Sequence, residues 1–428
     1  MERIRIDEKV LGDDLRHLAR FTLPGEVKGA VSRLPWTPED RAAVEWLRGR
    51  MEELGLVPSL DPLGNLWGVW DVDASESLVL GSHRDSVPQG GAFDGALGVM
   101  AALAVVRALR KAGHRPRHNL EVVAWNDEEG ARFGTTLFGS RMYVGALTPE
   151  VVVNMRDTAG VRLADAVQAA GYDLQRMRPS ATLARIAAYL ELHIEQGPVL
   201  EREHQEIGIV TGVGGIIQER ITLHGTRVHA AYSGGDRHDP VLAAARVLHR
   251  LAVVEADRNR MRPRAVLGVT VGRVELSSAL VNVVPESVSF TVDSRAPDPR
   301  DALAALESLH EELAAVSTSG GLSMKTAPLN DHTTLAGAGV RTEPIRFNAD
   351  LGAVIRHVSH DLGYRAIDLP SWAGHDAMAL GPRVPTAMIF VPSVRGLSHT
   401  PSEFTSDLDA GRGANVLLHT LLALDAAP

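Results

Sequence analysis

The chain contains no cysteine among its 428 residues. This absence excludes disulfides, thiolate metal ligands and thiol nucleophiles, so any bound metal must be held by histidine and carboxylate side chains. The sequence also lacks an excess of positive charge, because its net charge is -9 and its pI is near 6.0. Without a basic patch, we expect no nucleic-acid partner.

Long apolar segments are absent as well. The longest strongly apolar run, residues 95–106, is shorter than the ~20 residues that a membrane-spanning helix requires. The N-terminal stretch MERIRIDEKVLGDDL is charged and has no apolar signal core. We therefore expect a protein that is neither exported nor bound to a membrane, with a cytoplasmic location.

The first half of the chain alternates between strand and helix patterns. A length of 428 residues favours two domains. The expected elements are strands over 65–71, 78–81, 120–125 and 189–196, and helices over 7–19, 35–56, 97–112 and 158–170. Thr37 is the expected N-cap of the second helix, with Pro38 in its first turn. This alternation predicts an α/β sheet covered by helices.

A glycine cluster at 211–215 marks a change of pattern. The expected elements that follow are strands over 217–224, 265–274, 281–293 and 322–327, with helices over 240–254 and 299–315. The resulting order β-α-β-β-α-β is that of a split-βαβ, ferredoxin-like sandwich. We therefore predict three segments: 1–213 as the first part of one domain, 214–330 as an inserted domain, and 331–428 as the return to the first.

The stretch LVLGSHRDSVPQGGAFDGALG, residues 78–98, contains a candidate metal corner. A short apolar strand leads to His83, and glycines allow the chain to fold back so that Asp94 meets His83. Asp85 is placed to orient the imidazole of His83. From this stretch alone, a turn in which His and Asp only hydrogen-bond each other is an equally good interpretation.

Three further stretches contribute candidate ligands. VVAWNDEEG, residues 122–130, ends a buried strand in adjacent carboxylates, so one glutamate could bind metal while the other moves protons. An acidic helix start is the competing interpretation. His193 in the strand YLELHIEQ and His399 in the loop GLSHTPSE would each, if isolated, be ordinary hydrogen-bonded histidines.

Taken in order, these motifs resemble those of the N-carbamoyl-L-amino-acid hydrolases, β-ureidopropionases and allantoate amidohydrolases. The resemblance covers residues 81–403 and rests on GSHRDSV, GGAFDGALG, NDEEGARF, GSR, ELHIEQGP, NVVPESVSFTVDSR, AGHDA and GLSHTPSE. These families belong to the aminoacylase and carboxypeptidase clan of enzymes with two metal ions. The resemblance implies a catalytic domain with a mixed central sheet flanked by helices, and an inserted domain that serves as lid and dimerisation domain.

The resemblance also implies a site. Asp94 would bridge two divalent metal ions (Zn²⁺, or Mn²⁺, Co²⁺ or Ni²⁺), and Glu128 would be the general base. The implied metal ligands are His83, Asp94, Glu129, His193 and His399. Two such ions can lower the pKa of a bridging water and stabilise a developing oxyanion.

Four further residues are implied as substrate contacts. Arg295 would bind the carboxylate of a small substrate as a bidentate fork, and His229 would stabilise the tetrahedral oxyanion. Gln196 and Asn282 are the other implied contacts. Part of this set comes from the partner subunit in relatives, which implies a homodimer.

The sequence departs from the family pattern at three places: residues 230–236 after His229, Trp372 before the AGHDA motif, and Arg84 after His83. We expect these changes to alter the pocket wall and the lid, while the ligand set stays intact. The function expected from the resemblance is hydrolysis of a linear C–N bond other than a peptide bond, with an N-carbamoyl-L-amino acid as the preferred substrate. The alternatives are allantoate, an unusual N-acyl amide, a dipeptide, or a metal-dependent binding protein without catalysis.

Overall fold

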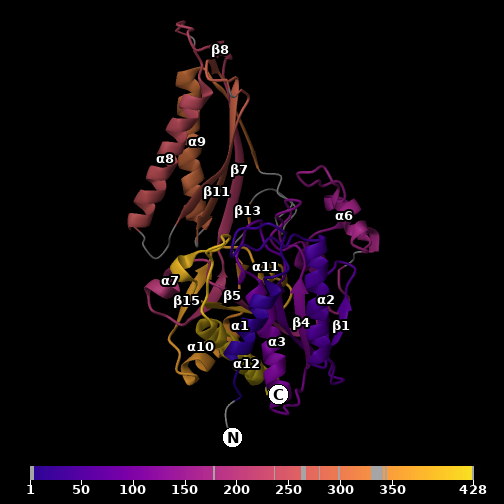
Figure 1. The fold of residues 1–428 in the computed structure, drawn as a ribbon. Helices are drawn as coiled ribbons and strands as arrows, with labels where there is room; N and C mark the ends of the chain where they lie inside the picture. Colours follow the sequence, from indigo (N-terminus) through magenta and orange to yellow (C-terminus); the bar gives the residue numbers. More distant parts are fainter. Residues whose placement is uncertain are drawn as a thin grey trace. The chain divides into compact units, whose positions relative to one another are not determined.

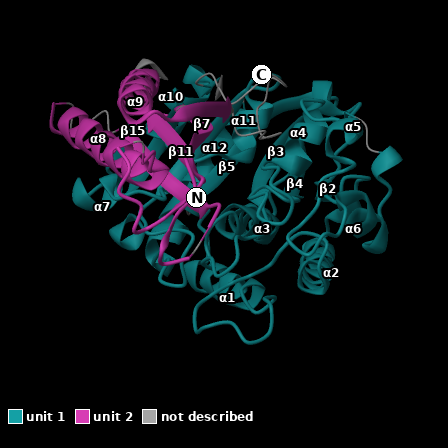
Figure 2. Ribbon diagram, turned by 90° about the horizontal axis from the view of Figure 1, so that it is seen from above, with its two compact units in different colours: residues 1–212, 345–428 teal, residues 213–344 magenta. Residues whose placement is uncertain are grey.

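The structure, a computed structural model, describes residues 4–176, 179–235, 237–261, 267–278, 280–296, 299–328, 341–342 and 345–426. The chain forms two compact units, coloured teal and magenta in Figure 2. Unit 1 comprises Met1–Gly212 and Ile345–Pro428, and unit 2 comprises Val213–Pro344. The predicted boundary at 330/331 falls outside the described residues and stays a prediction.

Unit 1 is built on one nine-stranded mixed sheet. Its strands are β1 (Val57–Leu60), β2 (Leu66–Trp70), β3 (Ser77–His83), β4 (Asn119–Trp125), β5 (Ile186–Ile194), β6 (Ile207–Val213), β14 (Ile345–Arg346), β15 (Ala366–Ser371) and β16 (Thr386–Val391). The order is β1-β2-β4-β3-β5-β16-β6-β14, and β15 also pairs with β6. The adjacent strands β4, β3, β5 and β16 run parallel, so their carboxyl ends meet at one edge.

The helices of unit 1 are α1 (Glu8–Leu18), α2 (Pro38–Glu53), α3 (Ala96–Lys111), α4 (Phe138–Val144), α5 (Pro149–Val152), α6 (Leu163–Ala169), α7 (Val199–Arg202), α10 (Ala349–Asp361), α11 (Asp376–Leu380) and α12 (Asp407–Asp425). Of these, α2, α3, α10, α11 and α12 pack against strands of the sheet (Figure 1). Helix α3 packs against β3, β5 and α12 and is buried along almost its whole length, because apolar residues occur on all its sides. The predicted sheet flanked by helices is therefore confirmed.

Local side-chain hydrogen bonds explain where two helices begin. Thr37 caps α2 as predicted, since its hydroxyl accepts a hydrogen bond from the Asp40 amide and Pro38 follows in the first turn. The helix predicted from residue 158 begins only at Leu163. The Asp157 carboxylate accepts the amides of Ala159 and Val161, and these bonds stabilise a turn where the helix was expected.

Unit 2 contains the predicted order of elements. Its strands are β7 (Gly215–His224), β8 (Val228–His229), β9 (Gly268–Leu276), β10 (Val283–Val284), β11 (Ser287–Ala296), β12 (Ser323–Pro328) and β13 (Arg341–Thr342), and its helices are α8 (Pro240–Met261) and α9 (Pro299–Gly320). The main sheet is antiparallel, in the order β12-β7-β11-β9. Its apolar face packs against α8 and α9. The single strand predicted over 281–293 is instead divided into β10 and β11 by Pro285, which has no amide to donate.

None of the helices in the described ranges combines the length and the apolar character needed to cross a lipid bilayer.

Arg84, which was expected to alter the pocket wall, is instead a buried structural residue. Its side chain is 0% exposed, and its Nε donates to Asp40 Oδ1 over 2.8 Å. Its other nitrogens donate to the carbonyl of Ala124 and the side-chain oxygen of Asn126. Arg84 therefore joins the start of α2 to the end of β4.

Replacing Asp40 with Asn should destabilise unit 1 strongly. The substitution leaves the guanidinium of Arg84 buried without a counter-charge, which typically costs about 3–5 kcal/mol. Urea denaturation followed by circular dichroism measures the change. The matched control is Asp13→Asn, which breaks exposed ion pairs with Lys9 and Arg16. Equal midpoints for the two variants would contradict the structural role of Arg84.

Candidate metal centre and active site

The four adjacent parallel strands carry the predicted metal ligands at or just beyond their carboxyl ends. His83 is the last residue of β3, His193 lies on β5, and Glu128 and Glu129 follow β4. His399 lies in the loop after β16, and Asp94 lies between β3 and α3. Residues far apart in the sequence thus come together at one edge of the unit 1 sheet.

The carboxylate of Asp94 lies among three imidazoles. Its Oδ1 is 3.3 Å from His83 Nε2 and 3.1 Å from His193 Nε2. Its Oδ2 is 3.3 Å from His399 Nε2, which also lies 3.3 Å from Glu129 Oε1. Four groups of potential ligand atoms occur among the described residues, and two of them, His83–Asp94–His193 and Asp94–Glu129–His399, share Asp94. The other two are Glu191–His193–His375 and His83–Glu128–Glu129.

Gly95 makes the approach of Asp94 to His83 possible. Its φ of 63° lies in the left-handed region, and a Cβ at this position would overlap the His83 ring. Glycine is therefore required by both conformation and space. The prediction that glycines fold this loop back onto His83 is consistent with this geometry.

Backbone carbonyls orient two of the imidazoles. His83 Nδ1 lies 3.1 Å from the carbonyl oxygen of Asp85, and His193 Nδ1 lies 2.9 Å from that of Ile194. In both rings the other nitrogen, Nε2, faces Asp94 and is the nitrogen that a metal ion would bind. His193 Nε2 also lies 3.2 Å from the amide nitrogen of Gly95.

The carboxylate of Asp85 has a different role from the one predicted. Its Oδ1 lies 3.7 Å from His83 Nδ1, beyond hydrogen-bonding distance. Instead, its two oxygens accept the backbone amides of Glu128 and Glu129 over 3.0 and 3.1 Å. The Asp85 side chain thus holds the loop that follows β4. The imidazole of His83 is contacted by the Asp85 backbone carbonyl and not by its carboxylate.

Glu128 has the properties of a proton acceptor. Burial raises the pKa of its carboxyl well above the usual range, the charge of His83 offsets part of this effect, and the charge of Glu129 adds to it. Its Oε2 lies 3.9 Å from His83 Nε2. A buried glutamate with a raised pKa can take a proton from a reacting water and hold it until a leaving group needs it.

The donor set fits two divalent cations. All ligand atoms are imidazole nitrogens or carboxylate oxygens, the set that zinc, manganese and cobalt accept. Glu129 Oε1 is buried, and His399 Nε2 lies 3.3 Å from it. Burial opposes the ionisation of Asp94, but hydrogen bonds from His193, His399 and His83 hold its pKa well below the usual range. An ionised, buried carboxylate of this kind suits a metal bridge.

The predicted substrate contact Gln196 also lies at this site. Its Nε2 donates to Asp94 Oδ2 over 2.7 Å, while its Oε1 is buried without a hydrogen-bond partner among the described residues. Its φ of 55° is unusual for a residue with a Cβ. Such strain is typical of residues held in place for function.

His375 also belongs to the cluster, although no role was predicted for it from the sequence. Its ring lies 4.5 Å from that of His193, centroid to centroid, and its Nδ1 is buried without a partner in the described part of the chain. Burial, together with the charge of His193, holds the pKa of His375 well below the usual range, so its ring is neutral. The AGHDA motif contained the signal, but a histidine before a short helix does not by itself indicate a site.

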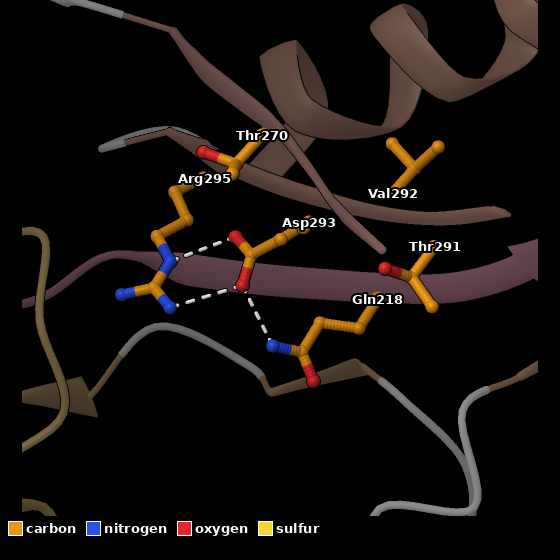
Figure 3. A pocket seen from close by; sticks show the side chains of 7 residues that line it. Gln218, Thr270, Thr291, Val292, Asp293 and Arg295 are labelled. Carbon is orange, nitrogen blue, oxygen red and sulfur yellow. Dashed lines mark hydrogen bonds and ion pairs between the residues drawn. The ribbon is translucent and has the colours of Figure 1, made fainter. Parts of the chain in front are cut away.

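Unit 2 contains the other predicted contacts in two places. His229 is exposed on β8, and its Nε2 lies 3.4 Å from Asn282 Nδ2. Arg295, near the end of β11, lines a pocket of about 280 Å³ with Gln218, Thr270, Gly272, Thr291, Val292 and Asp293 (Figure 3). The Asp293 carboxylate accepts hydrogen bonds from Arg295 Nε and Nη2 over 2.8 and 2.9 Å.

These two places lie toward opposite ends of the unit 2 sheet. Strand β11 begins at Ser287, next to the short ladder of β8 and β10 that carries His229, and Arg295 lies eight residues further along. At ~3.3 Å per residue, this separates Arg295 from the start of β11 by about 26 Å. A small substrate bound to Arg295 therefore cannot contact His229 of the same unit 2.

The mixed α/β sheet and the carboxylate that two ligand groups share are the features of a hydrolase-like α/β protein with a candidate metal centre. The model of peptidase family M20/M25/M40 matches residues 79–423. An N-carbamoyl-L-amino acid amidohydrolase from Geobacillus stearothermophilus is 36% identical over 403 residues, which cover 92% of this chain and 94% of the relative. An allantoate amidohydrolase from Bacillus subtilis (strain 168) is 32% identical, covering 99% of this chain and 100% of the relative.

Solved structures agree with this relationship. An amidase of the hydantoinase/carbamoylase family from Burkholderia multivorans has a TM-score of 0.84 and 33% identity, and the match covers 99% of both chains. The protein therefore belongs to peptidase family M20/M25/M40, and the predicted resemblance to its amidohydrolase members is confirmed.

Metal uptake should release protons. In the metal-free chain, hydrogen bonds from His399 to Asp94 and Glu129 raise the pKa of His399 to about 11, and the pKa of His193 is also raised, because Asp94 outweighs the effect of burial. The ring of His399 is therefore protonated at neutral pH and must lose its proton to bind metal, so the affinity should fall as the pH falls.

Calorimetric titration with Zn²⁺ in buffers of different ionisation enthalpy measures this release. His399→Ala should release fewer protons than the wild type. Equal heats in all buffers, after correction for dilution, would contradict the prediction.

Proposed function

We propose that this protein is a metal-dependent amidohydrolase that cleaves a linear C–N bond other than a peptide bond, with an N-carbamoyl-L-amino acid as its substrate. The observation that carries the proposal is the carboxylate of Asp94, shared by two ligand groups beside the buried Glu128. The names of the relatives from Geobacillus and Bacillus support the same type of reaction.

We assign His83, Asp94 and His193 to one cation, and Asp94, Glu129 and His399 to the other. Divalent zinc, manganese, cobalt or nickel ions bound there would supply an activated water and stabilise negative charge on the substrate oxygen. The raised pKa of Glu128 suits it to accept the proton of that water and to donate it to the leaving nitrogen. Neutral His375, beside His193, offers a hydrogen bond within the same cluster.

Arg295 is assigned to the substrate carboxylate. Its Nε and Nη2 donate to Asp293, which fixes the plane of the guanidinium. Burial opposes protonation, but the hydrogen bonds to Asp293 outweigh this effect and raise the pKa of Arg295. A fixed cation of this kind favours substrates that carry an acid group.

The distance within unit 2 supports the proposal of a homodimer. Arg295 and His229 of one chain cannot contact the same small substrate, because about 26 Å of strand separates them. If both act in catalysis, His229 and Asn282 must come from a second copy of the chain. Gln196 would contribute its unpartnered Oε1 as a substrate contact from unit 1.

Allantoate is the second candidate substrate. It carries a carboxylate and two ureido groups, and the Bacillus relative with this activity in its name matches 99% of this chain. An unusual N-acyl compound is a further candidate, because the segment 230–236, of which residue 236 lies outside the described residues, departs from the family pattern.

A substrate panel tests the proposal. The protein, loaded with Zn²⁺, Mn²⁺ or Co²⁺, should release ammonia from N-carbamoyl-L-amino acids faster than from allantoate, and should release little amine from N-formyl or N-acetyl analogues. Glu128→Gln should lower kcat by about 10²–10⁴-fold, the usual contribution of a general base, without loss of metal.

Glu121→Gln on β4, the strand that precedes Glu128, is the matched control, because Glu121 contacts Ser77 away from the cluster. Inactivity across the carbamoyl compounds would reject the substrate, and normal turnover by Glu128→Gln would reject the base.

Co-expression of two impaired variants tests whether each site is formed by residues of both subunits. His229→Ala should lower kcat by about 10²–10³-fold, as loss of an oxyanion donor does, and Arg295→Ala should raise KM. When the two are co-expressed, random pairing should leave about a quarter of the sites with both residues intact, and activity should return to about that level. A mixture no more active than its parents would place both residues within one chain's site.

A further inference from the structure

His399 is held differently from the other residues around Asp94. The side chains of His83 and His193 are each 1% exposed, whereas that of His399 is 48% exposed. His399 lies on a loop rather than a strand, and its φ of 56° is in the left-handed region that residues with a Cβ rarely adopt. Its position against Asp94 and Glu129 therefore requires other contacts to hold it.

The Glu403 carboxylate supplies such contacts. Its Oε1 accepts the backbone amides of Phe93 and Asp94 over 2.8 and 3.0 Å. Its Oε2 lies 2.8 Å from the hydroxyl of Ser398, the residue before His399. Glu403 is only 5% exposed, so this carboxylate bridges, within the protein interior, the loop that carries His399 and the loop that carries Asp94.

Two further details tighten this bridge. The Ser398 hydroxyl also lies 2.7 Å from Asp94 Oδ2, the oxygen that faces His399. A Cβ at Gly91 would overlap the Glu403 side chain, so Glu403 can occupy this position only because residue 91 is glycine. By contrast, His83 and His193 are oriented by carbonyls of Asp85 and Ile194, which lie outside this bridge.

We propose that Glu403 and Ser398 are positioning residues that hold His399 against Asp94 and Glu129, and that they thereby determine how tightly the Asp94–Glu129–His399 group retains its cation. The inference rests on the proposed metal centre. Groups that orient metal ligands typically change metal affinity by about 10–100-fold when they are removed. The larger effect falls on the cation of the Asp94–Glu129–His399 group, because His399 depends on this bridge, whereas His83 and His193 keep their own orienting contacts. The other cation is linked to the bridge only through the shared Asp94.

The experiment measures metal retention, without reference to activity. Wild type, Glu403→Ala and Ser398→Ala are loaded with Zn²⁺, freed of unbound metal, and titrated with a chelator while metal per chain is measured by mass spectrometry. Wild type should hold two ions. Glu403→Ala should lose the second ion at a chelator concentration about 10–100-fold lower, and the first ion should shift by a clearly smaller factor, because only Asp94 links it to the bridge. Ser398→Ala should shift the second ion by a smaller factor than Glu403→Ala does.

Conservative variants and a control separate positioning from general stability. In Glu403→Gln, an amide oxygen can still accept both backbone amides, and in Ser398→Thr the hydroxyl is kept, so both should retain two ions. Ser406→Ala removes the N-cap of α12 just beyond the same loop, where Ser406 accepts the Asp409 amide. It should lower the melting temperature while leaving both ions bound as in wild type.

The possible failures are distinguishable. A wild-type chain that holds fewer than two ions would overturn the proposed metal centre itself. Two ions in wild type with unchanged retention in Glu403→Ala would overturn only the role of Glu403. Equally weakened retention of both ions in Glu403→Ala, or a comparable loss of metal in Ser406→Ala, would show that these residues stabilise the fold in general. Either result would also overturn the inference.

Discussion

The carboxylate of Asp94 is the group on which the rest of the site depends. A buried carboxylate is costly unless positive charge or hydrogen bonds compensate it, and here three imidazoles and the Gln196 amide converge on its two oxygens. Each oxygen faces a separate set of ligand atoms. Because one small side chain belongs to both sets, any shift of its backbone moves both at once. The contacts of Gly95 and Glu403 to this short loop are thus as important as the ligands themselves.

The parallel strands explain how so many ionisable groups reach one place. Strands β4, β3, β5 and β16 are neighbours and run in one direction, so the loops that follow them begin at a common edge. Their interiors are apolar and form the core with α3 and α12. Rigid strands position the buried ligands, whereas loops supply His399 and Glu129. As a result, Glu129 and His399 of the Asp94–Glu129–His399 group lie on less constrained backbone than His83 and His193, which lie on strands.

The sequence predicted much of this arrangement, and its errors have physical causes. Apolar runs marked the strands, and polar residues directly after them marked the site, since ligands at strand ends are a local pattern. Contacts between distant loops have no such pattern. Asp85 was expected to contact its neighbour His83, yet its carboxylate reaches the amides after β4. Arg84 looked like a change in the pocket wall, but its partner Asp40 is far away in sequence. The role of Glu403, the last residue of the GLSHTPSE motif, could not be predicted, because nothing in the neighbouring sequence indicates that it accepts amides near Asp94.

The strand order has a consequence for biosynthesis. Strand β16 pairs in parallel with β5, although all of unit 2 is encoded between them. During translation, the N-terminal half of the sheet can form while its last central strand is still unmade, which leaves the edge of β5 open until late. A nascent chain then already carries one complete set of ligand atoms but not the other. Closing such a long loop is slow, so the order of synthesis delays the mature centre until nearly the entire polypeptide has emerged from the ribosome.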